Sequence, residues 1–132
     1  MNGYVVKLEQ ETLANTDFRR VLYTAKFSQL VLMCLKPGEE IGEEVHTLDQ
    51  FLRIDKGTGK AVLDGVEHAL GDGDAVVVPA GTKHNIINTS QTDEMKLYTV
   101  YSPPEHRDAV VHATKADAIA DKTDEFDGKT TE

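Results

Sequence analysis

The sequence of 132 residues lacks features that mark several classes of protein. It has one cysteine, Cys34, so it holds neither an intramolecular disulfide framework nor a cysteine-based zinc site. No apolar run approaches the roughly 18 residues of a membrane-spanning helix, and the N-terminus lacks a signal-peptide segment. Basic residues are outnumbered, 14 against 23 acidic ones, for a formal net charge of −9. These absences predict one domain in the reducing cytoplasm that binds neither nucleic acid nor an anionic membrane.

Helical patterns are also scarce, and we expect no helix before residue 112. Short apolar segments alternate with turns rich in Gly, Asp and Pro, and Asp64-Gly65 is a strong two-residue hairpin signal. The expected strands are 21–24, 29–35, a segment through 44–54, 60–64, 66–70, 75–78, one starting at 84, and 95–101, with 4–8 as an edge strand. In the strand 95–101, Thr99 and Tyr101 are expected to face inward and Lys96 to face solvent, and Cys34 is expected to be a buried, inert thiol. Many short strands without helices predict an all-β jelly-roll barrel.

The segment from Gly38 to Gly57 carries polar side chains at alternating positions. In an extended strand, Glu44, His46, Leu48, Gln50, Leu52 and Ile54 would share one face, because side chains alternate with a period of two. A carboxylate, an imidazole and an amide beside aliphatic groups indicate the inner wall of a pocket.

A second segment, Gly73 to Asn88, places His84 on the same face of its strand as Ile86 and Asn88. If the two strands pack across one small barrel, four side chains converge on a single ion. These predicted metal ligands are Glu44, His46, Gln50 and His84. The alternative is that these polar groups only satisfy one another by hydrogen bonds.

The two segments resemble the two motifs of the cupin superfamily, G-(x5)-H-x-H-(x3,4)-E-(x6)-G and G-(x5)-P-x-G-(x2)-H-(x3)-N. The second motif is matched throughout, whereas the first has Glu44 and Gln50 at two of its ligand positions. The resemblance covers residues 28–104, which leaves an N-terminal arm with edge strands (1–27) and an exit loop, short helix and C-terminal tail (105–132). It is nearest to single-domain cupins labelled mannose-6-phosphate-isomerase-like.

The departures from the first motif leave the total charge of the ligand set unchanged, since the one carboxylate moves from the fourth ligand position to the first. Two imidazoles and two oxygen donors suit one divalent Mn, Fe, Ni or Zn ion per chain. The resemblance implies an enzyme that acts on a small polar substrate, a carbohydrate derivative or an organic acid, by Lewis-acid chemistry. Isomerase, lyase, decarboxylase and dioxygenase reactions all fit, and a non-catalytic sugar-binding module is the alternative. Tyr101, as the catalytic candidate, and Thr99 are predicted to contact substrate, with plain barrel filling as the alternative.

Residues 102–112 contain a dense group of titratable side chains: Glu105, His106, Arg107, Asp108 and His112. They form either a lid whose Glu105 or His106 reaches the substrate or a solvated exit loop. A short helix is expected within 115–122, and 124–132 is expected to be disordered unless Phe126 docks on a second subunit. The resemblance implies a homodimer, and the segment 29–35, apolar on both faces, offers a surface for it.

Overall fold

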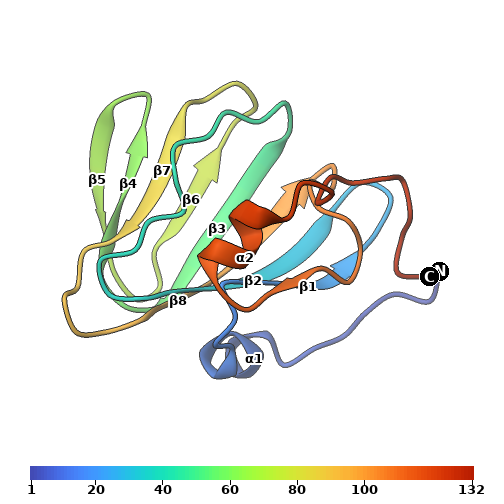
Figure 1. The fold of residues 1–132 in the computed structure, drawn as a ribbon, viewed down its shortest axis with the longest axis horizontal. Helices are drawn as coiled ribbons and strands as arrows, with labels where there is room; N and C mark the ends of the chain where they lie inside the picture. The colour runs from blue at the N-terminus through green and yellow to red at the C-terminus, as the bar shows by residue number, and fades with distance from the viewer.

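The computed structural model describes all 132 residues, and its strands form two antiparallel sheets that face each other (Figure 1). The larger sheet contains, in spatial order, β6 (Ala75–Val78), β3 (Asp49–Lys56), β8 (Met95–Ser102), β2 (Gln29–Leu35), β1 (Arg19–Thr24) and β9 (Val111–His112). The smaller sheet contains β5 (Val66–Leu70), β4 (Gly59–Leu63) and β7 (His84–Asn88). This arrangement confirms the predicted all-β jelly roll.

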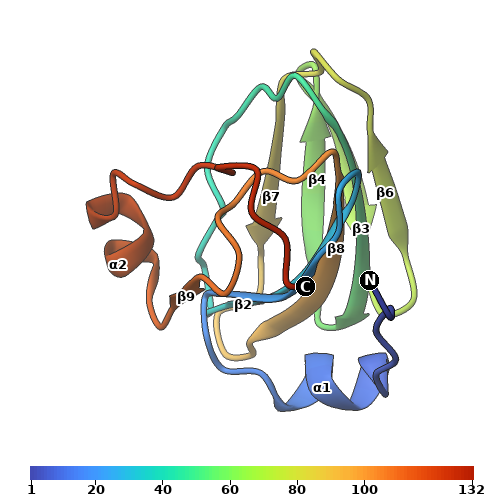
Figure 2. The same ribbon diagram turned by 90° about the vertical axis from the view of Figure 1, so that its right-hand side faces the viewer.

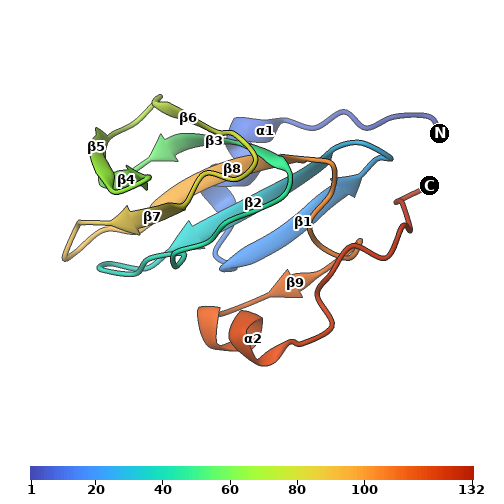
Figure 3. The same cartoon turned by 90° about the horizontal axis from the view of Figure 1, so that it is seen from above.

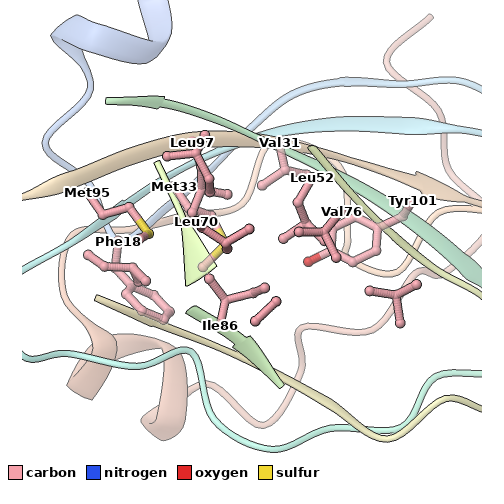
Figure 4. Close-up of a cluster of buried hydrophobic side chains, with 14 of the residues drawn as sticks. Phe18, Val31, Met33, Leu52, Leu70, Val76, Ile86, Met95, Leu97 and Tyr101 are labelled. Carbon is pink, nitrogen blue, oxygen red and sulfur yellow. The ribbon is translucent and has the colours of Figure 1, made fainter. Parts of the chain in front are cut away.

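The hydrophobic core fills the space between the two sheets (Figure 4). Alternate residues of β2, β3 and β8 point into it, and Met33, Leu52 and Leu97 are fully buried. Ile86 on β7 meets them from the smaller sheet. Each fully buried aliphatic side chain contributes roughly 2 kcal/mol to the folded state. The barrel therefore depends mainly on its apolar strands, and the polar residues of the site stand on a stable frame.

The hairpin between β4 and β5 turns at Asp64-Gly65, as predicted. Both residues have positive φ, 47° and 82°, which is the backbone that a two-residue turn between twisted strands requires. Gly59 at the start of β4 is needed for another reason, because a Cβ there would lie 2.2 Å from the carbonyl oxygen of Ile87. The smaller sheet thus owes its close strand packing to a residue without a side chain.

Two predictions for the N-terminus were wrong, because helix α1 (Leu8–Ala14) replaces the edge strand expected at 4–8 and precedes residue 112. Glu9 and Glu11 lie in its first turn, where negative charge is favourable. Seven residues are too few for a helix to persist alone, so packing must hold it. Thr12 is completely buried, and the helix lies against the larger sheet below the barrel (Figure 2).

Helix α1 also covers part of the outer face of β8 and β3. Lys96, expected to point to solvent, is 7% exposed, and its Nζ donates to the carbonyl oxygen of Asn15 at 2.5 Å. Leu32 and Cys34 on the same face are buried, which confirms the predicted buried thiol. The second apolar face of β2 is therefore covered within the chain and gives no support for a dimer.

The C-terminal region folds back on the barrel (Figure 3). The predicted short helix is α2 (Lys115–Ala120), which begins with a capping box between Thr114 and Asp117. The following tail was expected to be disordered, but it binds its own chain. The backbone N–H of Phe126 donates to the carbonyl oxygen of Glu105 at 3.0 Å, and that of Thr131 donates to Thr24 at 3.0 Å. No helix in the structure is long and apolar enough to cross a membrane.

Candidate metal site

The site begins with a reciprocal backbone pair between Glu44 and His84. Each backbone N–H donates to the other residue's carbonyl oxygen at 2.9 Å, which fixes two antiparallel segments side by side. Residues directly opposite in such a pair present their side chains on the same face. The segment before β3 therefore acts as an extra short strand along β7, and it brings the first ligand of one motif beside the histidine of the other.

Glu44, His46 and Gln50 do not lie on one continuous strand, as predicted from their alternation. The chain leaves the smaller sheet after Glu44 and enters the larger sheet only at Asp49, where β3 starts. The crossing is fixed by the turn that precedes β7. The N–H of Gly81 donates to the carbonyl oxygen of His46 at 2.8 Å, and the N–H of Ala80 donates to Asp49 Oδ1 at 2.9 Å. The predicted convergence is present, but it is produced by a crossing between sheets.

Three of the predicted ligands form a compact cluster. Donor atoms of Glu44, His46 and His84 all lie within 4.8 Å of one another, and the two imidazole rings are 5.0 Å apart. His46 Nε2 lies 2.8 Å from Glu44 Oε2, the distance of an ion pair. Two donor atoms this close are suited to share a cation once the His46 ring gives up its proton.

The two groups in this contact shift each other's pKa. The carboxylate of Glu44 raises the pKa of His46, although burial works against this. Burial opposes ionisation of Glu44, yet the nearby His46 outweighs it and the pKa of Glu44 falls below its usual value. Glu44 is therefore ionised at neutral pH, as a metal ligand must be.

Gln50 is held with its amide oxygen free. Its Nε2 donates to Thr99 Oγ1 at 3.0 Å, and Thr99 in turn donates to the carbonyl oxygen of Phe51 at 2.8 Å. Gln50 Oε1 is buried and has no hydrogen-bond partner. Buried polar atoms in native proteins almost always have a partner, so this oxygen fits a site that receives a cation. Gln50 and the three clustered residues suit the predicted ion.

The same contacts give Thr99 a further role. Its side chain is completely buried, and its hydroxyl accepts from Gln50 and donates to Phe51. Thr99 therefore orients a predicted ligand, and its contact with a substrate stays a prediction.

His84 is oriented in a similar way by the backbone. Its Nδ1 lies 2.9 Å from the carbonyl oxygen of Thr82, so the ring donates there and leaves Nε2 as the free donor atom. Metal-binding histidines commonly have this second hydrogen bond, which fixes the tautomer and the ring orientation.

The space between these side chains is small. A cavity of about 10 Å³ is bordered by Glu44, Gln50, His84 and Tyr101, together with aliphatic side chains. That volume accommodates one water-sized group. Burial raises the pKa of the Tyr101 phenol, so it stays protonated at neutral pH. Tyr101, the predicted catalytic residue, therefore meets the cavity as a hydrogen-bond donor.

A groove of about 560 Å³ is larger but touches this site only through His84. Its walls include Glu43 and Lys83, which pair with each other at 3.1 Å on the outside of the barrel. We therefore place the chemistry in the small cavity, where the unpaired donor atoms are.

The residues at 105–106 belong to the site more fully than the sequence suggested. Glu105 Oε2 lies 3.6 Å from His46 Nδ1, and the His106 ring lies 5.1 Å from that of Tyr101. His106 is 6% exposed, so the solvated-loop alternative is wrong. The buried amide of Gln29 holds this loop, because its Oε1 accepts from the N–H of His106 at 3.0 Å and its Nε2 donates to the His106 carbonyl at 2.8 Å.

Two functional candidates were missed from the sequence. Arg19 and Asp124 lie beside His106 in the folded protein, 105 positions apart in the chain. Arg19 stands at the start of a strand and Asp124 in a polar tail, so neither belongs to a motif. Only the density of charged residues around 105–112 indicated a polar cluster at this end of the barrel.

Comparison with known proteins agrees with the geometry. Residues 31–101 match the family model described as a cupin domain. The chain belongs to the cupin family. An uncharacterised protein of Acanthamoeba polyphaga mimivirus is 45% identical to this cupin over 96% of the chain and 82% of its own length. Uncharacterised YrkC of Bacillus subtilis is 46% identical over 89% of the chain and 66% of its own length. The crystal structure of BH2720 from Bacillus halodurans has a TM-score of 0.88 at 41% identity, covering 91% of this cupin and 96% of that chain.

Proposed function

We propose that this cupin is a metal-dependent enzyme that acts on a small polar substrate, a carbohydrate derivative or an organic acid. Glu44, His46, Gln50 and His84 would hold one divalent ion. The observation that carries the proposal is the buried, unpaired Oε1 of Gln50, which borders the same cavity as Glu44 and His84. A purely structural network would be expected to satisfy this atom.

Two imidazole nitrogens and two side-chain oxygens make a donor set for Mn, Fe, Ni or Zn. When bound, such an ion polarises a carbonyl, enediol or carboxylate oxygen of the substrate as a Lewis acid. Tyr101 would donate a hydrogen bond to the substrate from the cavity wall, since its phenol keeps its proton. Glu105 faces the outer nitrogen of the His46 ring, a position from which a carboxylate orients a ligating imidazole.

The reaction class is proposed from resemblance. An isomerase is favoured by the likeness of the motifs to the mannose-6-phosphate-isomerase-like group, and dioxygenase or decarboxylase chemistry uses similar donors. A non-catalytic module that binds a small molecule or sugar, the alternative that the motifs leave open, is the second candidate function.

The deciding experiment has two stages. Elemental analysis of the purified protein should find about one Mn, Fe, Ni or Zn ion per chain. The protein is then assayed with aldose, ketose and keto-acid panels under each ion. Turnover that chelation abolishes and a single ion restores supports the enzyme. Tight ligand binding without turnover favours the module, and failure to load any divalent ion contradicts the metal site.

A homodimer is a further part of the proposal, from the resemblance to small cupins. Val77 on the edge strand β6 is 63% exposed, and Phe51 and Tyr98 on the adjoining strands have rings 6.3 Å apart. This side of the larger sheet is the part that we expect a second copy to cover. Light scattering at micromolar concentration should give twice the mass of the chain for the wild type and the single mass for Val77→Asp. A wild-type mass of one chain contradicts the dimer.

A further inference from the structure

A second buried cluster lies beside the candidate metal site and is not used by the function proposed above. Arg19 and His112 are directly opposite each other on β1 and β9, and Arg19 donates to His112 Nδ1 at 3.3 Å. His106 approaches from the exit loop. Arg19 and His106 face one carboxylate, that of Asp124 in the tail beyond α2. Asp124 Oδ2 lies 2.8 Å from His106 Nδ1 and 3.7 Å from Arg19. His112 is already used, because its Nδ1 accepts from Arg19 and its Nε2 lies 3.0 Å from Asp121 Oδ2.

Asp124 fills this cluster incompletely. Arg19 Nε, His106 Nε2 and Asp124 Oδ1 are all buried without a hydrogen-bond partner. The side chains of Arg19 and His106 are more than nine-tenths buried, so bulk water does not satisfy them. Each such atom has lost its hydrogen bonds to water on burial without gaining one in the protein, which is unfavourable. The pairing of Asp124 with this cluster is therefore incomplete on both sides, unlike a network that serves stability alone.

The cluster adjoins the small cavity through Tyr101. The Tyr101 ring lies 5.1 Å from that of His106 and 6.0 Å from that of His46. One ring thus separates the two groups of residues. A molecule of a few heavy atoms could reach both groups if the Tyr101 and Glu105 side chains moved aside.

The segment that supplies Asp124 can be displaced more easily than the barrel. Around Asp124 it contains neither helix nor strand, and most of residues 121–132 are exposed. Around Asp124 its backbone is held by the bond from Phe126 to Glu105, and its end is tied down by Thr131 and Glu132, which bond to Thr24 and Tyr23. Segments with few buried contacts open locally at a small fraction of the global unfolding free energy.

We propose that Arg19 and His106 form a binding subsite for the carboxylate of a small anionic substrate, which Asp124 occupies until the substrate displaces it, with His112 orienting Arg19. The proposal rests on the proposed function for its second part, in which the other end of the substrate reaches the metal ligands. Exchange of one carboxylate for another leaves the local charge unchanged, so the acidic surroundings do not oppose it. The substrate class is then an organic acid or an acidic sugar, and a neutral sugar is disfavoured.

Malonate binding, measured by calorimetry on chelator-treated protein, tests the subsite without the metal. Asp124→Asn removes the competing charge at nearly constant shape, and malonate should bind this variant at least about tenfold more tightly than the wild type. Asp127→Asn is the matched control, because it makes the same change at an exposed position of the same tail. It should bind malonate like the wild type. The double variant with Arg19→Gln and Asp124→Asn should lose the gain in malonate affinity. Neutral malonamide should bind neither the wild type nor any of these variants.

The wild type provides an independent measurement if Asp124→Asn folds poorly. Saturating malonate should accelerate hydrogen exchange at the N–H of Phe126, since displacement of the tail breaks its bond to Glu105. Unchanged exchange in saturated protein overturns the proposal. So does equal malonate affinity in Asp124→Asn and the wild type.

Metal content separates this proposal from the proposed function. If malonate binds only after metal loading, the anion is a metal ligand, and the subsite is wrong while the metal site stands. If Asp124→Asn gains malonate affinity but no variant retains a divalent ion, the subsite stands and the metal-dependent function fails.

Discussion

Thr99 and Gln50 are joined by a 3.0 Å hydrogen bond that determines which end of the Gln50 amide enters the cavity. Thr99 donates its own proton to the carbonyl of Phe51, so its oxygen can only accept from the amide nitrogen. The amide oxygen is thereby left toward Glu44 and His84. The Thr99 hydroxyl on the neighbouring strand thus determines that Gln50 turns its amide oxygen, and not its nitrogen, toward the cavity.

Thr99→Val should lower the affinity for divalent metal by about 10–100-fold, as the loss of a residue that orients a ligand commonly does. Valine has nearly the same shape but cannot hold the amide. Titration of chelated protein with Mn²⁺ or Zn²⁺ measures the effect. In a Gln50→Leu background the same change should cost nothing further, because there is no amide left to orient. An equal loss in both backgrounds would show that Thr99 acts through the barrel and not through Gln50.

His84→Ala should remove most bound metal and leave the fold intact. It takes away one of two imidazoles, and the remaining oxygens bind late first-row ions less well. Elemental analysis measures the loss, and circular dichroism checks the fold. The melting temperature should drop modestly, because an ion bound only by the folded state stabilises it. His68→Ala, at an exposed histidine of β5, is the control and should keep its metal. Stoichiometric metal in His84→Ala contradicts the ligand set, and unfolding identifies a structural core residue.

The contact between Glu44 and His46 should make the stability of the metal-free protein depend on pH. The folded protein holds the His46 proton more tightly than the unfolded chain, since Glu44 raises the pKa of His46 above 6.5. Stability from this pair is therefore complete below about pH 6.5 and is lost as pH rises through the raised pKa. It is also lost at the acid end, as pH falls through the lowered pKa of Glu44.

Urea unfolding of the wild type and Glu44→Gln measures this contribution. The difference in unfolding free energy should be largest at about pH 5–6 and shrink toward pH 8. Because ligation requires neutral His46, the stabilisation by added metal should show the opposite trend. A difference that grows between pH 6 and 8 would contradict the assigned direction.

Gln29→Leu should destabilise the protein by about 3 kcal/mol. The buried Gln29 amide binds the backbone of the exit loop and Thr24 Oγ1, and leucine leaves the N–H and C=O of His106 without partners. Urea unfolding measures the change. Gln91→Leu, at an exposed position, should alter stability by less than about 0.5 kcal/mol. A small effect at Gln29 would mean that water replaces its amide.

The barrel could be predicted because its signals are local. Alternating apolar residues, together with turns such as Asp64-Gly65, placed most strands within one or two residues, although β3 starts five residues later than expected and β9 was not predicted. The α1 helix was missed because seven residues carry a weak pattern and the helix is stabilised by packing on the larger sheet. Lys96 was misplaced for the same reason, since its burial depends on that helix.

The site was predictable only as far as the motifs extend. Glu44, His46, Gln50 and His84 follow from fixed spacings, although the path between them crosses from one sheet to the other. The pairing of Asp124 with Arg19 could not be foreseen, because it depends on how a tail of polar residues folds back after α2. Thr99 was assigned to the correct face of its strand, but its partners depend on the register between β3 and β8.

The predicted ligands are divided between the two layers of the barrel. Glu44 and His84 are fastened to the smaller sheet by backbone bonds, whereas Gln50 is part of the larger one. A ligand held by all four residues cross-links the two layers. It joins positions that are far apart in the chain and close in space. Such a link resists separation of the sheets, which is the step that unfolding requires. It should therefore act on the lifetime of the native state, slowing unfolding while leaving the rate of refolding nearly unchanged.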